Sequence, residues 1–137
     1  MVGCVFIPHF CEKLFTGETF RQADVSAFTD LSVPMPYLMV IIAGLCEFFG
    51  SIAITCGFLT RLSAICTTLY LIFATYLGGH FSAGYIWVME GGGWEYPVLW
   101  IALILYFSVF GPGYFSIDQH MIKAYKPPKF IKWLTGI

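Results

Sequence analysis

The run from Met35 to Cys56 is almost entirely apolar, and Glu47 is its single charged residue. About 20 consecutive apolar residues are enough for a helix to cross a bilayer, so this run predicts a transmembrane helix. The whole chain shares this character, with 58% hydrophobic and 11% charged residues. A soluble domain usually carries roughly a quarter charged residues. The sequence therefore indicates an integral membrane protein.

Three further apolar segments, residues 1–15, 62–77 and 95–110, are expected to form crossings. The first is short, and a signal peptide is the alternative to a helix. It opens MVGCVF without a basic residue and ends in Glu12-Lys13, which favours the helix. Only the sequence GFLTR separates the run at 35–56 from the one at 62–77, so these two helices should form an antiparallel hairpin. The prediction is an all-α polytopic membrane protein, a bundle of four transmembrane helices.

The connections also carry patterns. Residues 18–34 alternate apolar and charged side chains, which predicts an amphipathic helix at the membrane interface, ended by Pro34 and Pro36. Residues 78–94 form a loop rich in glycine and aromatic residues, expected to lie on the membrane surface. We divide the chain into a four-helix membrane domain, residues 1–118, and a basic, aromatic tail, residues 119–137, that anchors at the interface.

The distribution of basic residues predicts the orientation. With four crossings, the hairpin turn and the tail lie on one side of the membrane and hold Arg61, Lys123, Lys126, Lys129 and Lys132. The other side holds only Lys13 and Arg21. The positive-inside rule then places both termini in the cytoplasm, with the protein in the inner (plasma) membrane. A net charge of -1 provides no basic surface for nucleic acid.

The five cysteines predict no cofactor site. They lie in apolar segments, with no C-x-x-C pair and no histidine at metal-ligand spacing. Such cysteines usually serve as small apolar residues in the interior. We expect no metal site, and no cofactor motif is evident.

Glu47 is the most informative residue, because an ionisable group at membrane depth is costly and usually faces a partner or a wet cavity. It lies about 18 Å along its helix, near the middle of the bilayer. Its helical neighbours are small, namely Ala43, Gly44, Gly50 and Ser51, and small residues let another helix approach closely. Glu47 should therefore face protein. Two roles stay open: a protonated carboxyl that holds helices together, or a group that carries protons.

A second set of polar residues is expected at the outer ends of the helices. His9, Glu12 and Lys13 share one helix face, while His80 begins the outer loop and Glu95 begins the last crossing. We expect Lys13 to pair with Glu12 or Glu95, with His80 nearby, as a mouth for an amphipathic head group. The alternative is a set of interfacial groups that pair with one another and with water. Arg61 is expected to cap the cytoplasmic hairpin.

Four motifs occur in a fixed order along the chain: EKLF followed by Gly17, EFFG at 47–50 in the span opened by Pro34, GFLTR at 57–61, and GPGYFSID at 111–118. Taken together they resemble the DoxX family of membrane proteins, over nearly the whole chain. The resemblance implies a four-helix membrane protein related to the small subunits of thiosulfate:quinone oxidoreductase and to membrane partners of redox and detoxification systems. By the same resemblance, Lys13, Glu47, Arg61 and Asp118 occupy positions of the family's polar signature.

Two classes of function follow, and whether the chain is an enzyme stays open. In the first, the chain is the membrane subunit of a quinone-linked redox system, with a quinone held among its helices. In the second, it is a non-catalytic accessory subunit that packs against a larger membrane complex. The first predicts a polar pocket within one chain, and the second predicts a large apolar contact face. A transporter is a weaker third possibility, because four crossings with one buried acid would need oligomerisation to form a pathway.

Overall fold

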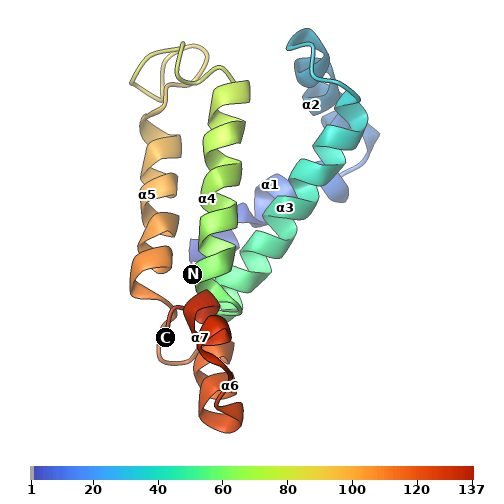
Figure 1. The fold of residues 1–137 in the computed structure, drawn as a ribbon. Coiled ribbons are helices and arrows are strands. Elements are labelled where there is room, and N and C mark those ends of the chain that lie inside the picture. Colours follow the sequence, from blue (N-terminus) through green and yellow to red (C-terminus); the bar gives the residue numbers. More distant parts are fainter. Residues whose placement is uncertain (1) are drawn as a thin grey trace.

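The computed structural model describes residues 2–137, apart from the side chain of Phe20; Met1, where the first predicted crossing begins, lies outside the described residues. Within this range the chain is all-helical, with no strand, which confirms the predicted all-α class, while the bundle of four crossings stays a prediction (Figure 1). The elements are a 3-10 helix, η1 (Val2–Phe6), and the α-helices α1 (Ile7–Leu14), α2 (Glu18–Asp30), α3 (Pro36–Cys56), α4 (Thr60–Leu77), α5 (Glu95–Phe110), α6 (Ile117–Tyr125) and α7 (Lys129–Thr135).

Helices α3 and α4 form the predicted antiparallel hairpin. Both are long and apolar enough to cross a membrane, whereas α5 is apolar but shorter. The turn between them is tight because Gly57 and Leu59 both adopt left-handed backbone angles, with φ of 65° and 44°. The two helices meet at this turn and diverge away from it, while α5 runs beside α4 (Figure 1).

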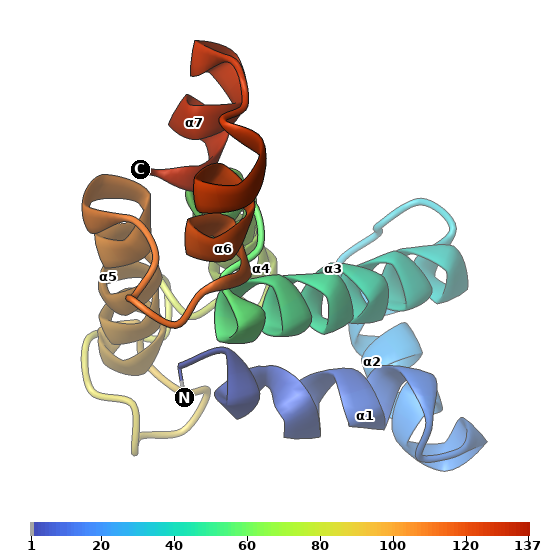
Figure 2. The same cartoon turned by 90° about the horizontal axis from the view of Figure 1, so that it is seen from below.

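The first predicted crossing is broken into η1 and α1, which lie along α3 in the opposite direction (Figure 2). Two contacts fix their register. The Ser51 hydroxyl donates to the carbonyl oxygen of Gly3 at 2.8 Å, and the side chain of Leu14 packs on the bare backbone of Gly44. The small-residue strip on α3 therefore admits a neighbouring helix closely, as predicted. Helix α1 ends beside Gly44, about 12 Å short of the N-terminal end of α3.

Helix α2 covers the N-terminal part of α3 beyond the end of α1 (Figure 1). A helix was expected here, but it ends at Asp30 and not at the prolines. Ser32 breaks it with a φ of 55°. Pro36 instead opens α3, where its missing N–H removes no hydrogen bond. The position of α2 at a membrane interface stays a prediction.

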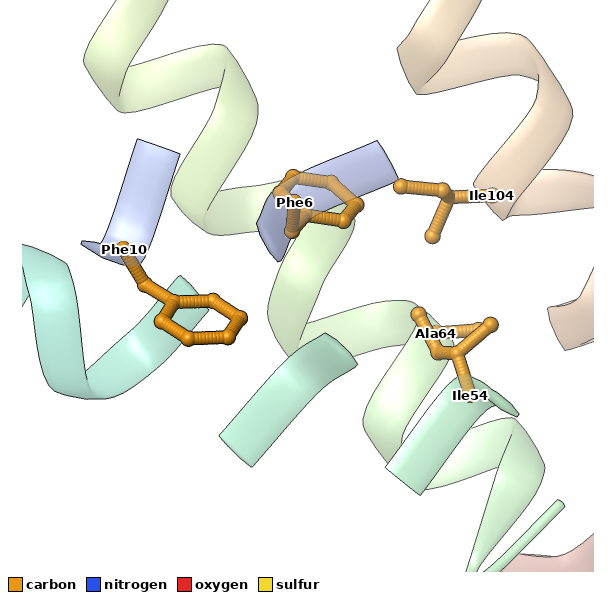
Figure 3. Close-up of a cluster of buried hydrophobic side chains, with 5 residues drawn as sticks. All are labelled: Phe6, Phe10, Ile54, Ala64 and Ile104. Atoms are coloured by element: carbon orange, nitrogen blue, oxygen red, sulfur yellow. The ribbon is translucent and has the colours of Figure 1, made fainter. Parts of the chain in front are cut away.

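A buried apolar cluster joins five elements (Figure 3). Its members are Phe6 of η1, Phe10 of α1, Ile54 of α3, Ala64 of α4 and Ile104 of α5. Ala64 and Ile104 are fully buried. This cluster fastens the N-terminal segment to the α3–α4 hairpin and to α5, so the groups carried by α1 have fixed positions.

Helix α6 begins at the hairpin turn and extends away from it, and α7 returns to pack against α4 (Figure 1). Ser116 begins α6 and accepts a hydrogen bond from the amide of Gln119. The backbones of Gly111 and Gly136 approach so closely that a Cβ atom on either residue would overlap the other. The proposed boundary between residues 118 and 119 falls within α6.

Candidate functional site

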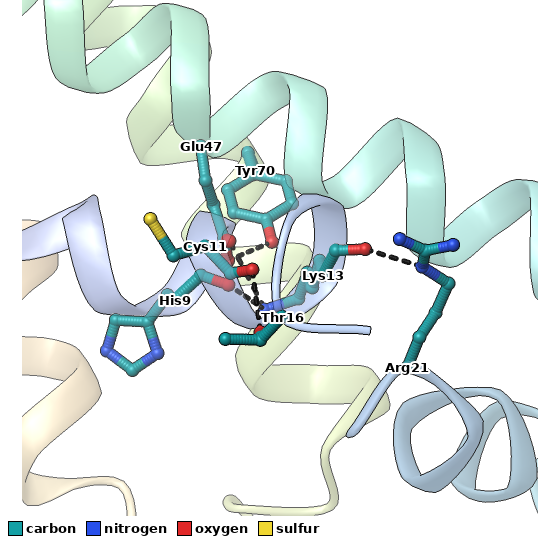
Figure 4. Close-up of polar contacts among 7 residues, drawn as sticks. All are labelled: His9, Cys11, Lys13, Thr16, Arg21, Glu47 and Tyr70. Atoms are coloured by element: carbon teal, nitrogen blue, oxygen red, sulfur yellow. Dashed lines mark hydrogen bonds and ion pairs between the residues drawn. The ribbon is translucent and has the colours of Figure 1, made fainter. Parts of the chain in front are cut away.

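Glu47 lies near the middle of α3 and is 6% exposed. Its Oε1 atom accepts a hydrogen bond of 2.6 Å from the hydroxyl of Tyr70 on α4. Its Oε2 atom lies 3.2 Å from the ammonium nitrogen of Lys13 on α1. This is the one ion pair among residues 2–137 (Figure 4). The carboxyl group thus connects three helices.

The two contacts of Glu47 differ in kind. The Tyr70 bond has good hydrogen-bond geometry, whereas Lys13 approaches Oε2 at ion-pair distance without forming a hydrogen bond to it. Oε2 is buried and accepts no hydrogen bond from any described residue. Buried charges are normally paired, and the ammonium group of Lys13 is the charge partner of this oxygen.

Lys13 is held at the last turn of α1. Its side chain is 16% exposed, and its ammonium group also lies 3.4 Å from the carbonyl oxygen of His9. Arg21 of α2 donates to the carbonyl oxygens of Lys13 and Leu14, at 2.8 and 3.0 Å. Carbonyls at the end of a helix have no partner within the helix, so Arg21 supplies the missing donors. The cation is therefore fixed by α2 as well as by α1.

A cavity of about 220 Å³ lies beside Glu47. Its walls come from η1, α1, α3, α4, α5 and the loop 78–94. Most of the lining is apolar, and the ionisable side chains in it are Glu47, His9 and His80. Trp87, Tyr96 and Trp100 provide aromatic rings on the side of the loop and α5. An apolar cavity with a few placed polar groups is typical of a site for a small molecule.

The loop 78–94 closes one wall of the cavity through internal hydrogen bonds. The Nδ1 atom of His80 lies 2.6 Å from the carbonyl oxygen of Gly92, and the Glu95 carboxylate accepts from the amide of Trp87 at 3.3 Å. The Trp87 ring lies 5.2 Å from the rings of both His80 and Tyr96. These contacts hold the aromatic wall in place.

The five residues expected at the outer ends do not form one cluster. His9 and His80 both line the cavity, and the ring of His9 points away from the carboxylate of Glu47 (Figure 4). Glu95 serves the loop, and Glu12 is exposed. The partner predicted for Lys13, Glu12 or Glu95, is wrong, because Lys13 pairs with Glu47. The reason is depth: α1 ends beside the middle of α3 and not at its outer end.

Arg61 and Asp118 both lie near the hairpin turn, far along the chain from Lys13, and they have different partners. Asp118 is fully buried and accepts hydrogen bonds from the amides of Leu59 and Thr60, both at 2.8 Å, and from the Thr60 hydroxyl at 2.7 Å. Arg61 donates to the carbonyl oxygens of Ser108 and Trp133. Asp118 therefore caps the start of α4, and Arg61 ties α4 to α5 and α7.

Sequence reasoning missed Tyr70, although the hairpin carried the signal. Glu47 lies eleven residues before Phe58, and Tyr70 lies eleven residues after Leu59, so the two are equally far from the centre of the turn. Residues equidistant from a short antiparallel turn face each other, so Tyr70 is the polar side chain opposite Glu47. Sequence reasoning also missed that Arg21 binds the carbonyl groups at the end of α1. This contact depends on the position of α2, which no sequence motif predicts.

Comparison with known proteins identifies the family. No curated protein and no solved structure matches the chain. The model of the DoxX family matches residues 1–80, which is more than half of the chain. The matched part includes Lys13, Glu47, Tyr70 and the whole α3–α4 hairpin. The chain therefore belongs to the DoxX family of membrane proteins.

Proposed function

We propose that this protein is the membrane subunit of a quinone-linked redox system, and that the cavity beside Glu47 holds the ring of a quinone-type molecule. The observation that carries the proposal is a buried carboxyl group, paired with Lys13 and Tyr70, at the wall of an aromatic cavity. Ionisable groups at membrane depth usually mark a functional site.

The size of the cavity supports a small ring. An apolar cavity of about 150 Å³ is enough to bind benzene, and the cavity here is about 220 Å³. It has room for one substituted ring or two fused rings, with any isoprenoid tail outside. A nucleotide or a flavin is too large, since drug-sized ligands occupy about 300–1,000 Å³.

The proposed placement is the inner (plasma) membrane, with four crossings and both termini in the cytoplasm. The hairpin turn, α6 and α7 lie at one end of the molecule (Figure 1), and this end holds Arg61 and the four lysines of the tail. The positive-inside rule favours that end as cytoplasmic. A reporter enzyme active only outside the cytoplasm, fused after Lys132, should be silent, and activity there would reverse the orientation.

Ring binding can be tested through tryptophan fluorescence. Trp87 and Trp100 line the cavity, whereas Trp133 lies on α7 and does not. A short-chain ubiquinone added to the protein in lipid nanodiscs should quench the fluorescence with a saturable dependence on concentration. The double variant Trp87→Phe/Trp100→Phe should lose most of that quenching, and Trp133→Phe should keep it. Quenching that does not saturate, or that Trp133→Phe alone removes, contradicts the proposed site.

A second candidate function is an accessory subunit that packs against another membrane protein. An open apolar groove of about 790 Å³ between α3 and α4 favours it, with Ile42, Leu45, Phe49 and Ile52 in its lining. A photo-cross-linking residue at Ile52 should capture the partner in cells. The same residue at Val109 of α5, an exposed position outside the groove, is the matched control. Equal capture of many proteins at both sites would remove support for a docking face.

A further inference from the structure

The end of the molecule that carries the hairpin turn is strongly basic. Its charged residues are Arg61, Lys123, Lys126, Lys129 and Lys132. Residues 48–89 and 96–137 contain a single acid, Asp118, and its side chain is fully buried. The four lysines are exposed, and none of them takes part in an ion pair within residues 2–137. This end therefore presents five positive charges and no exposed acidic side chain.

Most of the acidic side chains lie toward the other end. Five of them belong to α2, the loop 78–94 and the start of α5, namely Glu18, Asp24, Asp30, Glu90 and Glu95. These elements lie at the end of the molecule opposite the tail helices α6 and α7 (Figure 1). Charge is therefore separated along the molecule, and an anionic partner is attracted to the end that carries α6 and α7.

Exposed aromatic rings lie among these lysines. Tyr125, Phe130 and Trp133 are 81%, 69% and 53% exposed. The guanidinium group of Arg61 lies 5.7 Å from the centre of the Trp133 ring, so this ring stands beside the hairpin turn. Basic and aromatic residues in alternation are typical of segments that lie against a lipid surface. The headgroup region of a membrane offers both charge for the lysines and an apolar boundary for the rings, which an acidic protein surface does not.

Both ends of the pair α6 and α7 are fixed at the hairpin turn. Helices α3 and α4 are about 31 and 27 Å long, close to the hydrocarbon thickness of about 30 Å, so their turn belongs at the edge of the hydrocarbon. Helix α6 begins there, where the amide of Asp118 donates to the carbonyl oxygen of Gly57 at 2.9 Å. Helix α7 ends there, with the backbone of Gly136 against that of Gly111. The lysines are therefore held beside the membrane surface.

The lysines lie within electrostatic reach of lipid headgroups. Even if α6 stood perpendicular to the membrane, Lys123 and Lys126 would lie only about 9 and 14 Å beyond its first residue. Helix α7 returns toward the turn, so Lys132 lies closer to the membrane. Headgroups fill about 5–7 Å outside the hydrocarbon, and a charge acts over a further Debye length of about 8 Å at physiological salt. A negatively charged lipid surface can therefore attract all of these charges.

We propose that the tail helices α6 and α7 bind anionic phospholipid through Lys123, Lys126, Lys129 and Lys132, with the ring of Trp133 among the headgroups. This goes beyond an interfacial position of the tail, because it assigns the charge of the lipid and the groups that select it. It does not depend on the proposed quinone site. Near an anionic surface, one lysine strengthens binding by a factor of about five.

The test measures how bromine-labelled lipids quench the fluorescence of Trp133. The full chain is reconstituted in vesicles of phosphatidylcholine that contain about one tenth phosphatidylglycerol, with the bromine on one lipid or on the other. The difference between the unaltered chain and Trp133→Phe isolates the emission of Trp133. A fivefold preference corresponds to a local fraction of phosphatidylglycerol about three times its bulk fraction, and we expect at least this enrichment at low salt. At about 1 M salt most of it should disappear, because the Debye length falls to about 3 Å.

Two outcomes of this measurement overturn the proposal. Equal quenching per molecule by the two lipids shows that the tail does not select anionic lipid. This is also the result expected if the true partner is an acidic protein, since the vesicles contain only lipid and this chain. Quenching by neither lipid shows that Trp133 lies away from the membrane surface.

The variant Lys123→Gln/Lys126→Gln/Lys129→Gln/Lys132→Gln tests whether these four residues make the selection. The side chains are exposed and form no ion pair within the described part of the chain, so the variant should fold normally by circular dichroism. Its enrichment in phosphatidylglycerol should fall to about 1.5-fold or less. The matched control replaces the same four lysines by arginine, which keeps the charge and should keep the enrichment. Enrichment that persists in the glutamine variant, or that both variants lose, overturns the assignment to the charges of the tail.

Discussion

The two buried acids Glu47 and Asp118 both contact α4, but they differ in the number and kind of their partners. Asp118 accepts three hydrogen bonds, which use both of its carboxylate oxygens. Glu47 accepts one hydrogen bond, pairs with one cation, and keeps one oxygen without a hydrogen bond beside a cavity. The partners of Asp118 are three hydrogen-bond donors on two neighbouring residues, whereas those of Glu47 are one hydroxyl and one cation on two different helices.

This difference indicates that Asp118 has a structural role, whereas Glu47 is suited to a ligand site. Asp118 completes the backbone hydrogen bonds at the start of a helix, as a capping side chain does. Glu47 satisfies no backbone group, and its burial is costly unless it is paired. The position of the Glu47 carboxyl group at the wall of a cavity, paired with Lys13, supports the proposed ligand site.

The largest expected effect breaks the ion pair from its cationic side. Lys13→Met leaves the Glu47 carboxylate buried without its cation, and such changes cost about 3–5 kcal/mol. Unfolding in mixed detergent micelles, followed by circular dichroism, measures the loss. Lys13→Met/Glu47→Gln should be more stable than Lys13→Met alone, because no unpaired charge stays behind. A Lys13→Met protein as stable as the unaltered chain would show that the ion pair is incidental.

A smaller loss is expected when the capping acid is removed. Asp118→Ala leaves the amides of Leu59 and Thr60 without acceptors, and we expect a loss of about 2–3 kcal/mol. Binding of the quinone probe should be unchanged, since Asp118 does not line the cavity. The two acids differ as argued only if this variant loses stability and keeps the ligand. Loss of ligand binding at full stability would reverse their roles.

The third effect concerns the hydrogen bond that the Glu47 carboxyl group accepts from Tyr70. Tyr70→Phe removes the hydroxyl but keeps the ring, and we expect a loss of about 1–2 kcal/mol. Because the ion pair with Lys13 is untouched, binding of the short-chain ubiquinone should persist. The same unfolding titration, together with the tryptophan quenching assay, checks both parts. Lost quenching would mean that Tyr70 positions the carboxyl group for the ligand.

The smallest effect removes one of three donors from the well-satisfied acid. Thr60→Val keeps the shape of the side chain and both backbone amides, so Asp118 retains two hydrogen bonds. We expect a loss of about 0.5–1 kcal/mol, less than for Tyr70→Phe. If Thr60→Val lowers the stability more than Tyr70→Phe does, it is wrong that Asp118 has partners to spare and Glu47 has not.

The hairpin, the importance of Glu47 and the small-residue strip could be predicted from the sequence, because each is encoded locally. A charge within an apolar run is conspicuous, and a five-residue connection permits only an antiparallel neighbour. The partner of Lys13 could not be predicted in the same way. It depends on how far α1 extends along α3, which is set by the contacts of Gly3 and Gly44 and not by any motif.

The cavity could not be predicted from the sequence either, because it also depends on contacts between distant segments. The aromatic residues of the loop 78–94 were recognised, but the sequence does not say that the loop folds inward. The amides of Trp94 and Glu95 bond to the carbonyls of Gly84 and Tyr85, and this brings Trp87 beside His80. Such pairing within an irregular segment depends on tertiary packing, so His80 was expected beside Lys13 and lies instead with His9 at the cavity.

Because Asp118 caps the start of α4, the cap can form only after a much later part of the chain has been synthesised. Thr60 precedes its acceptor by 58 residues. At about 5–20 residues per second, a ribosome needs about 3–12 s to synthesise that stretch. During this interval the start of α4 has two backbone donors that only water can satisfy. The start of α4 therefore reaches its final form only after Asp118 has been synthesised.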